Sequence, residues 1–439
     1  MPELNTLPKP ADSEVDAGAA LDLPPRPPAS EEERNERTFF RARLLREIRH
    51  FISDNGPLAA MLAVVFVNLI GFGIIVPLMP FFANSLDAQP WQVTLMFSAY
   101  SLGQFFAEPY FGRLSDRIGR KPVLIVTTAL SVAFYAALAF APNIWAAIAI
   151  RFFSGISSGN ISTIQSYVSD VSKPEQRAAR MSLIGAAFSL GFIVGPAVGG
   201  FVPGDQFRAP LMTAAVLSAI ACFGVIFFIR ESRERIQTAP PPNLAVTAKA
   251  VFRDPVIVRV ILATLCYMGA FAGLESTFGL WAHAQYGWDK KEIGAIFPLI
   301  GLTAGIMQII VMRPLVRRYG ETKVLAGGLF LFGLSFTLQA LNSSELLITP
   351  IVVLGTIGQS VIFSSICAII SLATPPDKTG ATLGLNMSTG AIARISGPMV
   401  AGGLFTAFGP DAPLWMGAAL TIPAGLLALQ SGRVQKRAA

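Results

Sequence analysis

"GRLSDRIGRKPVL", residues 112–124, is echoed by "RPLVRRYGETKVL", residues 313–325, and this likeness decides the fold. Both stretches are basic, both carry a glycine at the same place (Gly119 and Gly320), and each lies between long apolar runs. "GAAFSLGFIVGPAVGG", residues 185–200, is echoed at nearly the same offset by "MSTGAIARISGPMVAG", residues 387–402. The repeat predicts two similar halves, with a cavity where they meet near the middle of a membrane.

Composition predicts that both halves are made of membrane-spanning helices. The 439 residues are 53% hydrophobic and only 14% charged, with a mean hydropathy of +0.56. A soluble chain of this length needs more charge to cover its surface. Apolar runs of about 20 residues, each long enough to cross a bilayer, recur along the chain. We therefore expect an all-α membrane protein with about twelve transmembrane helices in two pseudo-symmetric six-helix bundles.

The basic residues of the loops predict the orientation. The expected spans are 58–82, 92–112, 122–141, 145–168, 179–202, 210–229, 257–282, 292–312, 322–341, 346–371, 379–406 and 413–430. Loops 83–91, 142–144, 342–345 and 407–412 contain no Lys or Arg, whereas 113–121, 169–178, 230–256 and 313–321 carry most of the loop bases. Because basic loops favour the cytoplasm, we expect a multi-pass protein of the inner (plasma) membrane with both termini cytoplasmic.

The remaining segments complete the domain plan. Residues 1–37 are Pro-rich and acidic, which predicts a disordered tail. Residues 38–56 have apolar residues on one helical face and arginines elsewhere, as in a helix lying on the membrane surface. The alternative is a frayed start of the first span. The six-helix bundles are expected at 57–230 and 257–430, a cytoplasmic linker at 231–256 and a cytoplasmic tail at 431–439.

Cysteine and histidine usage argues against metal or redox chemistry. Cys222, Cys266 and Cys367 lie within apolar spans without CxxC spacing, and the chain has only two histidines. We expect no metal, no cofactor and no enzyme activity, because no nucleophile–base set is visible. The pI of about 9.5 would suggest nucleic acid in a soluble protein, but here the bases flank spans, so no nucleic-acid partner is expected. The expected partners are the lipid bilayer, protons and a small-molecule substrate, and the expected state is a monomer.

Three motifs resemble those of the major facilitator superfamily. "GRLSDRIGRKP" (112–122) is similar to that family's signature between helices two and three, and "RFFSGISSG" (151–159) to its fourth-helix signature with an intramembrane arginine, Arg151. "GFIVGPAVGG" (191–200) resembles the fifth-helix motif associated with antiporters. Together they resemble the twelve-span drug:proton antiporter group, near the tetracycline and multidrug exporters. One departure is Asn68, where members of that group often carry an acid.

The resemblance implies roles for two of these motifs. In the first, it implies a charge latch on the cytoplasmic side in which Asp116 faces a helix N-terminus across the bundle interface, where the helix dipole favours an anion. The alternative is a plain basic loop. The latch residues are Gly112, Arg113, Asp116, Arg117, Gly119 and Arg120, the two glycines being expected to permit tight backbone turns.

In the fifth-helix motif, Gly191, Gly195 and Gly199 lie on one face and permit close helix packing, and Pro196 bends the helix. That this bend also seals the outer side is implied by the resemblance.

Polar residues inside the spans predict the walls of the cavity. The fourth expected span and the tenth are unusually polar, and such residues avoid lipid. The expected wall residues are Asn68, Gln104, Asn160, Gln165, Glu275 and Gln359. Hydrogen bonds between helices are the competing explanation for each of them.

Very few charges remain inside the spans, and they predict the coupling site: Arg151, Arg394, Glu108 and Glu275. Charges at such depth indicate function by default, with static pairing as the alternative. Apolar neighbours of Glu275 favour its neutral acid and an arginine favours its carboxylate. Glu275 is therefore the best candidate for carrying a proton. Glu108 lies one helical turn before Gly112 and could instead reach the cytoplasmic interface.

These features predict a secondary active transporter that exports an amphiphilic drug-like molecule by proton-coupled antiport and alternating access. The first alternative is a symporter or facilitator that imports an organic anion, attracted by Arg151 and Arg394. A non-transporting sensor or lipid-translocating protein is a further alternative, but its expected mark, an added soluble domain or long ordered loop, is absent from the sequence.

Overall fold

The computed structural model describes residues 56–173, 176–201, 207–232 and 254–438. Every regular element in these ranges is a helix. The predicted tail 1–37, the predicted surface helix up to residue 55 and most of the predicted linker 231–256 lie outside the described residues. The domain plan drawn for those segments therefore stays a prediction.

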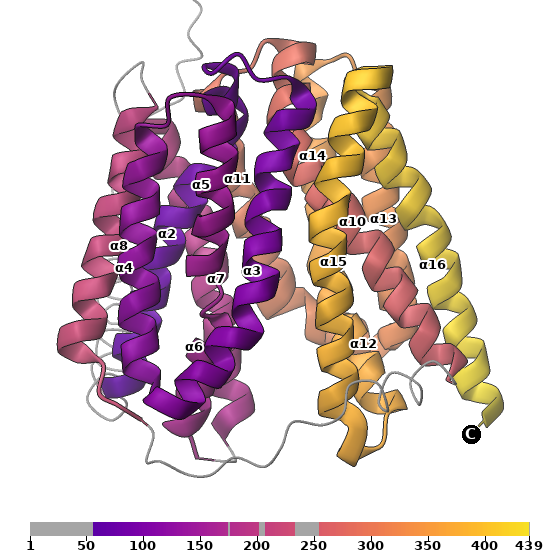
Figure 1. Cartoon of the computed structure of the whole chain (residues 1–439). Helices are drawn as coiled ribbons and strands as arrows, with labels where there is room; N and C mark the ends of the chain where they lie inside the picture. Colours follow the sequence, from indigo (N-terminus) through magenta and orange to yellow (C-terminus); the bar gives the residue numbers. More distant parts are fainter. Residues whose placement is uncertain (1–55, 174–175, 202–206, 233–253, 439) are drawn as a thin grey trace, which may run out of the picture. The chain divides into compact units, whose positions relative to one another are not determined.

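The first half of the described chain forms seven helices in the order of the sequence (Figure 1). They are α2 (Gly56–Asn84), α3 (Pro90–Ile118), α4 (Arg120–Ala139), α5 (Ile144–Ser157), α6 (Ile161–Asp170), α7 (Arg177–Phe201) and α8 (Arg208–Phe228).

The second half repeats the same up-and-down course. Its elements are α10 (Pro255–Tyr286), α11 (Lys290–Ile306), the π-helical turn η2 (Met307–Val311), α12 (Met312–Tyr319), α13 (Glu321–Leu341), α14 (Glu345–Ala373), α15 (Pro376–Phe408) and α16 (Ala412–Ala438). The helix α16 therefore continues through most of the segment predicted as a tail, residues 431–439.

The all-α membrane fold is confirmed. In the described ranges, nine helices are long and apolar enough to cross a membrane, and they include spans predicted in both halves. The three other predicted crossings also form as helices: α3, α7, and the pair α5 and α6. Apolar clusters are buried between the helices of both halves, around Tyr135 and Tyr167 in the first half and around Trp281 in the second.

The two glycines that the repeat aligns have the same role. Gly119 separates α3 from α4 with φ 105°, and Gly320 separates α12 from α13 with φ 79°. Such positive φ values favour glycine. The prediction that residues 113–121 and 313–321 form loops is thus mostly wrong, because α3 and α12 continue as helices up to these glycines. Long basic side chains are compatible with helix at the membrane interface, since they extend toward water while the backbone stays helical.

The fourth predicted span is not one helix but two. It is interrupted between Ser157, the end of α5, and Ile161, the start of α6. The intervening Ser-Gly-Asn sequence is a poor helix former. Hydrogen bonds to α4 hold the interruption: the Asn160 side-chain amide donates to the Thr127 hydroxyl at 3.0 Å, and the hydroxyls of Ser157 and Ser131 lie 3.0 Å apart.

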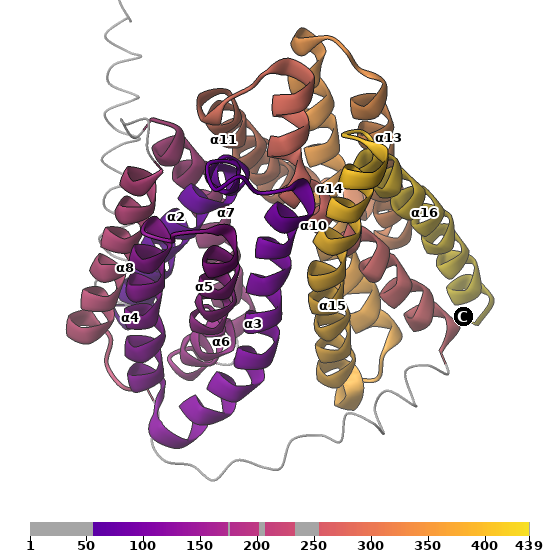
Figure 2. The ribbon, with the colours of Figure 1, turned by 45° about the horizontal axis from the view of Figure 1, so that its top comes forward.

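The two halves touch near one end of the helices. We call the end where α8 stops and α10 starts the linker end, and the opposite end the far end. Figure 2 shows α3 and α15, one from each half, beside each other. Near the far end, the ring of Phe81 lies edge-on against that of His283, 5.9 Å between centroids. A Cβ built on Gly279 would lie 3.0 Å from Pro80. These contacts close the far end of the space between the halves.

Candidate functional site

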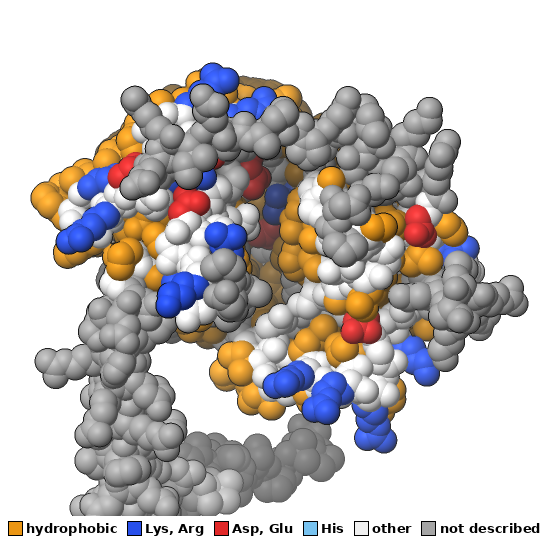
Figure 3. All heavy atoms as spheres, turned by 90° about the horizontal axis from the view of Figure 1, so that it is seen from below, with side chains coloured by type: hydrophobic (Ala, Val, Ile, Leu, Met, Phe, Trp, Pro, Cys, Tyr) orange, Lys and Arg blue, Asp and Glu red, His pale blue; other side chains and the backbone are white. Residues whose placement is uncertain are grey.

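A cavity of about 530 Å³ lies about half way along the helices and is walled by both halves. Figure 3, which views the linker end, shows a hollow between the two sets of helices with charged side chains at depth. Cavities of this size suit small organic molecules. The predicted wall residues found in its lining are Asn68, Gln104, Asn160, Glu275 and Gln359. Aromatic rings from both halves, such as Tyr100 and Phe271, cover much of the rest.

Gln165 is the exception among the predicted wall residues. It lies on α6, its side chain is exposed, and it is not among the residues that line the cavity. The prediction treated 145–168 as one continuous helix. The interruption at 158–160 changes the helical phase of everything after it, so Gln165 no longer lies on the face that carries Arg151. The assignment of Gln165 to the wall is therefore wrong in this structure.

Three of the four predicted intramembrane charges meet in the cavity. Arg151 on α5, Glu275 on α10 and Arg394 on α15 are the charged side chains in its lining. Two positive charges act on the Glu275 carboxyl group, and the charge of Arg394 acts more strongly than that of Arg151. Within the described residues, however, no salt bridge joins Glu275 to either arginine. The static Glu275–arginine pair, which was the alternative to proton coupling in the sequence analysis, is not formed in this structure.

Arg151 is held in an unusual way for a buried cation. Its side chain is 1% exposed, and its guanidinium carbon lies 4.2 Å from the centre of the Tyr100 ring. In the described part of the chain, its Nε and Nη1 atoms have no hydrogen-bond partner. A desolvated guanidinium over an aromatic face is stabilised by roughly 2 kcal/mol. That is less than a buried charge costs without a carboxylate partner, so Arg151 remains available to an anionic group.

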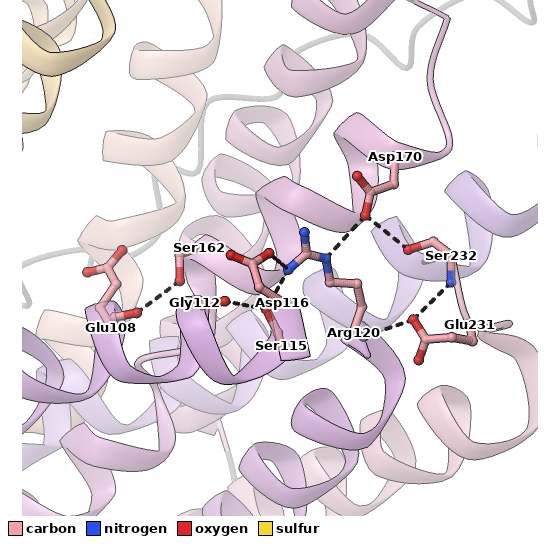
Figure 4. Close-up of polar contacts among 9 residues, drawn as sticks. All are labelled: Glu108, Gly112, Ser115, Asp116, Arg120, Ser162, Asp170, Glu231 and Ser232. Atoms are coloured by element: carbon pink, nitrogen blue, oxygen red, sulfur yellow. Dashed lines mark hydrogen bonds and ion pairs between the residues drawn. The ribbon is translucent and has the colours of Figure 1, made fainter. Parts of the chain in front are cut away.

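Glu108, the fourth predicted charge, is placed differently. It is half-buried on α3 and is not part of the cavity lining. Its backbone carbonyl accepts a hydrogen bond from the Ser162 hydroxyl at 3.1 Å, and its carboxyl group points away from Arg120 (Figure 4). The positive charge of Arg394, which lines the cavity, also acts on the Glu108 carboxyl group.

A polar group that the sequence reading missed lies on α13. The Gln339 side-chain amide donates to the Ser335 hydroxyl at 3.1 Å, and that hydroxyl donates to the Ile351 carbonyl at 2.8 Å. Because the hydroxyl hydrogen is used on Ile351, Ser335 can only accept from Gln339, which fixes the amide orientation. Both residues line the cavity. The signal was present as Ser335 and Gln339 in an apolar span, one helical turn apart.

A second polar cluster lies at the linker end, around Arg120 (Figure 4). Its guanidinium pairs with Asp116 at 2.7 Å and with Asp170 at 3.1 Å, and donates to the Ser115 hydroxyl at 2.7 Å. The Glu231 carboxylate accepts from the backbone N–H of Arg120 at 2.8 Å and from that of Lys121 at 3.0 Å. An acid thus sits on the N-terminus of α4, where free N–H groups favour an anion. We call these residues the Arg120 cluster.

The predicted latch residues fall into three groups. Asp116, Gly119 and Arg120 belong to the cluster or to the turn beside it. Arg113 and Arg117 are exposed. Gly112 lies inside α3 rather than in a turn, where a Cβ would come 3.2 Å from the Ser162 hydroxyl. A helix N-terminus opposite Asp116 in the other half would be that of α15, whose first side chains lie outside the described residues, so the latch across the halves stays a prediction.

The fifth-helix motif lies on the face of α7 that packs against α2. A Cβ on Gly191 would meet Leu69 at 2.6 Å, one on Gly195 would meet the Cα of Gly73 at 2.7 Å, and one on Gly199 would meet the Ile74 carbonyl at 3.1 Å. The three glycines therefore allow two helix backbones to approach closely. Pro196 lies inside the same helix.

The sequence matches the family model described as Major Facilitator Superfamily over residues 61–313 and 284–437. It is 26% identical to "Tetracycline resistance protein, class C" of Escherichia coli, over 85% of this chain and 95% of that protein. It is also 26% identical to "Multidrug resistance protein 2" of Bacillus subtilis, over 79% of this chain and 88% of that protein. A crystal structure of the human organic anion transporter MFSD10 (TETRAN) is similar with a TM-score of 0.65 and 25% identity, covering 85% of this chain and 98% of that one.

Proposed function

The chain belongs to the major facilitator superfamily and is therefore a membrane transporter, and we propose that it exports an amphiphilic drug-like molecule in exchange for protons. The observation that carries the proposal is Glu275, an acid in the cavity wall that shares the cavity with two arginines and forms no salt bridge with them in the described residues. The similarity to tetracycline and multidrug resistance proteins supports export of such compounds.

Glu275 can couple proton movement to substrate movement because both use one cavity. As a carboxylate it offsets part of the positive charge of Arg151 and Arg394, whereas as a neutral acid it leaves that charge to the substrate. In a cavity with mostly apolar walls, this change of one unit of charge is felt strongly. The protonation state of Glu275 therefore changes which occupant the cavity favours on each side of the membrane, as exchange requires.

The substitution Glu275→Gln tests the proposal. Glutamine keeps the volume and the hydrogen bonding but cannot release a proton. In proteoliposomes we expect a pH gradient to stop driving uphill export, while counterflow exchange of substrate continues. Substrate binding should survive and lose most of its pH dependence. Glu292→Gln is the matched control, because Glu292 is an exposed acid of the same half and glutamine can also serve in its capping box.

Two other outcomes decide against this role. A folded Glu275→Gln protein that still concentrates substrate with protons would remove Glu275 from the mechanism, and Glu108 would be the next candidate. Loss of folded protein that is rescued by Arg394→Gln or Arg151→Gln would mean that Glu275 is a static partner of that arginine, since an uncompensated buried charge costs roughly 3–5 kcal/mol.

Import of an organic anion is the second candidate, because the cavity holds two arginines against one glutamate. The similarity to the human organic anion transporter favours the same substrate class. The two candidates differ in direction under one imposed gradient. An antiporter accumulates substrate on the acidic side of a vesicle membrane, and a proton symporter accumulates it on the alkaline side. Flux of tetracycline and of an aromatic carboxylate, measured in the same vesicles, separates them.

We also propose that the protein resides in the plasma membrane with the linker end in the cytoplasm. The basic residues of the linker end, such as Arg113, Arg117 and Arg317, support this orientation. Single cysteines placed at residue 113 and at Asp87, which lies at the far end, should react with an impermeant maleimide from opposite sides. Labelling of residue 113 from outside intact cells would reverse the orientation.

A further inference from the structure

Arg151 faces an aromatic ring where a buried cation would ordinarily face a carboxylate. Its guanidinium carbon is 4.2 Å from the Tyr100 ring centre, both residues line the cavity, and Tyr100 is 9% exposed. Glu275 is in the same cavity, yet it is outside ion-pair distance of Arg151. The position of the guanidinium therefore has a cause other than attraction to the acid.

The packing of α3 on α5 supplies that cause. A Cβ on Gly155 would lie 2.0 Å from the carbonyl oxygen of Tyr100, and one on Gly103 would lie 2.1 Å from the carbonyl oxygen of Phe152. Two glycines, one on each helix, thus bring the two backbones into direct contact beside the Tyr100 ring. The ring also packs against that of Phe72, with 5.5 Å between the two centroids. Tyr100 is therefore a rigid platform at the glycine contact.

The charged and titratable groups around the pair are few. Arg151 is influenced by Tyr100, Tyr135 and Glu275, and Glu275 by Arg394 and Arg151. A π face attracts a guanidinium without carrying a net charge. It can therefore hold Arg151 without neutralising it, and the arginine does not fix Glu275 as a permanent carboxylate.

We propose that Tyr100 is a positioning residue whose ring withholds Arg151 from Glu275, so that the acid stays free to gain and lose a proton. This inference rests on the proposed role of Glu275 in coupling. It gives Tyr100 a task that its aromatic face performs and its hydroxyl does not.

The variants Tyr100→Phe and Tyr100→Leu test this assignment. Phenylalanine keeps the aromatic face and should leave the Arg151 guanidinium and the pH range in which Glu275 titrates as in wild type. Leucine removes the face, and the Arg151 guanidinium should then move to within about 4 Å of Glu275. The substrate-independent readout is the infrared band of the protonated carboxyl group that Glu275→Gln removes. In Tyr100→Leu we expect this band to require at least a tenfold higher proton concentration than in wild type, and pH-driven export of tetracycline to fall with it.

A double variant and a structure make the test decisive. Adding Arg151→Gln to Tyr100→Leu should return the band to its wild-type pH range, because the Arg151 guanidinium that moved toward Glu275 is then absent. If the band titrates alike in wild type and Tyr100→Leu, the inference is overturned and Tyr100 is packing only. If Glu275→Gln removes no titrating band, the proposed coupling fails, and an electron cryo-microscopy structure of Tyr100→Leu still decides the geometry: an unmoved guanidinium overturns the positioning role. Tyr100→Met, closer in volume, replaces leucine if that variant does not fold.

Discussion

Arg120 is a single residue on which several others depend. Its side chain is 7% exposed and contacts Asp116, Asp170 and the Ser115 hydroxyl, which come from α3 and α6. Because its planar fork reaches two carboxylates at once, a lysine cannot replace it. Its removal would leave two acids close together without their cation.

We expect Arg120→Ala to lower the stability of the detergent-solubilised protein by roughly 1–3 kcal/mol, a range that discounts the ion pairs for the partial exposure of both aspartates. The measurement is the temperature at which half of the monodisperse protein is lost. Arg113→Ala is the control, since Arg113 is exposed and its replacement removes the same charge from the neighbouring helix α3. Equal effects of the two variants would mean that the cluster does not stabilise the fold.

The substitution Asp116→Asn tests the role of Asp116 in the latch rather than its contribution to the stability of the fold. The Asp116 side chain is 34% exposed, so losing its charge should cost less than about 1 kcal/mol of stability. We expect transport to slow while substrate affinity stays the same, because the balance between the two conformations changes and the cavity does not. Transport rates in reconstituted vesicles, measured beside binding, check this. An unchanged rate would rule out the latch.

At this scale the sequence predicted most of the charged and polar residues of the cavity wall, and it missed the role of Tyr100. Glu275, Arg151 and Arg394 stand out because a charge in an apolar span is costly. Tyr100 does not stand out, because an aromatic residue in a membrane helix is ordinary. Its importance lies in its distance to Arg151, which arises from two glycines on different helices.

Among the helices, α2 and α7 are packed in a contact that requires glycine in place of larger residues. A Cβ on Gly195 would lie 2.7 Å from both the Cα of Gly73 and the carbonyl oxygen of Ile70. These are backbone atoms, which cannot move aside as a flexible side chain could. The two helices would have to separate.

We expect Gly195→Ala to destabilise the protein by about 1–3 kcal/mol through this overpacking. Gly185→Ala on the same helix is the matched control, because a Cβ there meets nothing within 4 Å in the described part of the chain. Thermal stability in detergent, measured for both variants, gives the comparison. If Gly195→Ala is as stable as Gly185→Ala, the glycines of the fifth-helix motif are not packing contacts.

The elements show where sequence patterns stop being sufficient. Hydropathy located the spans, and the repeat placed Gly119 and Gly320 at equivalent turns. Hydropathy did not predict the interruption between α5 and α6, because Thr127 and Ser131 on α4 stabilise this interruption. The Ser-Gly-Asn sequence is a weak local signal, whereas a partner on another helix leaves no mark in the local pattern. The wrong position given to Gln165 follows from overlooking both.

In the whole unit of residues 56–439, the far end is closed by side chains of one half set against glycines of the other. A Cβ on Gly402 would lie 1.9 Å from the Thr94 hydroxyl, and one on Gly301 would lie 1.9 Å from a side-chain carbon of Ile193. Thr94 and Ile193 belong to the first half, and the glycines belong to the second. Alternating access requires this surface to open, so its fit sets the balance between the two conformations.

The last prediction follows from that fit. Gly402→Ala and Gly301→Ala place a methyl group where only the closed far end is crowded, so they should favour the state open at the far end. A clash of about 1–3 kcal/mol corresponds to roughly 5- to 150-fold in the conformational equilibrium. Gly403→Ala and Gly305→Ala are matched controls on the same helices, since a Cβ at either meets nothing within 4 Å among the described residues. In a background without native cysteines, a cysteine at the cavity residue Asn68 should react faster with an impermeant maleimide from the far side in the first two variants and at the unmodified rate in the controls. Unchanged labelling in Gly402→Ala and Gly301→Ala would mean that the far end is closed by other contacts.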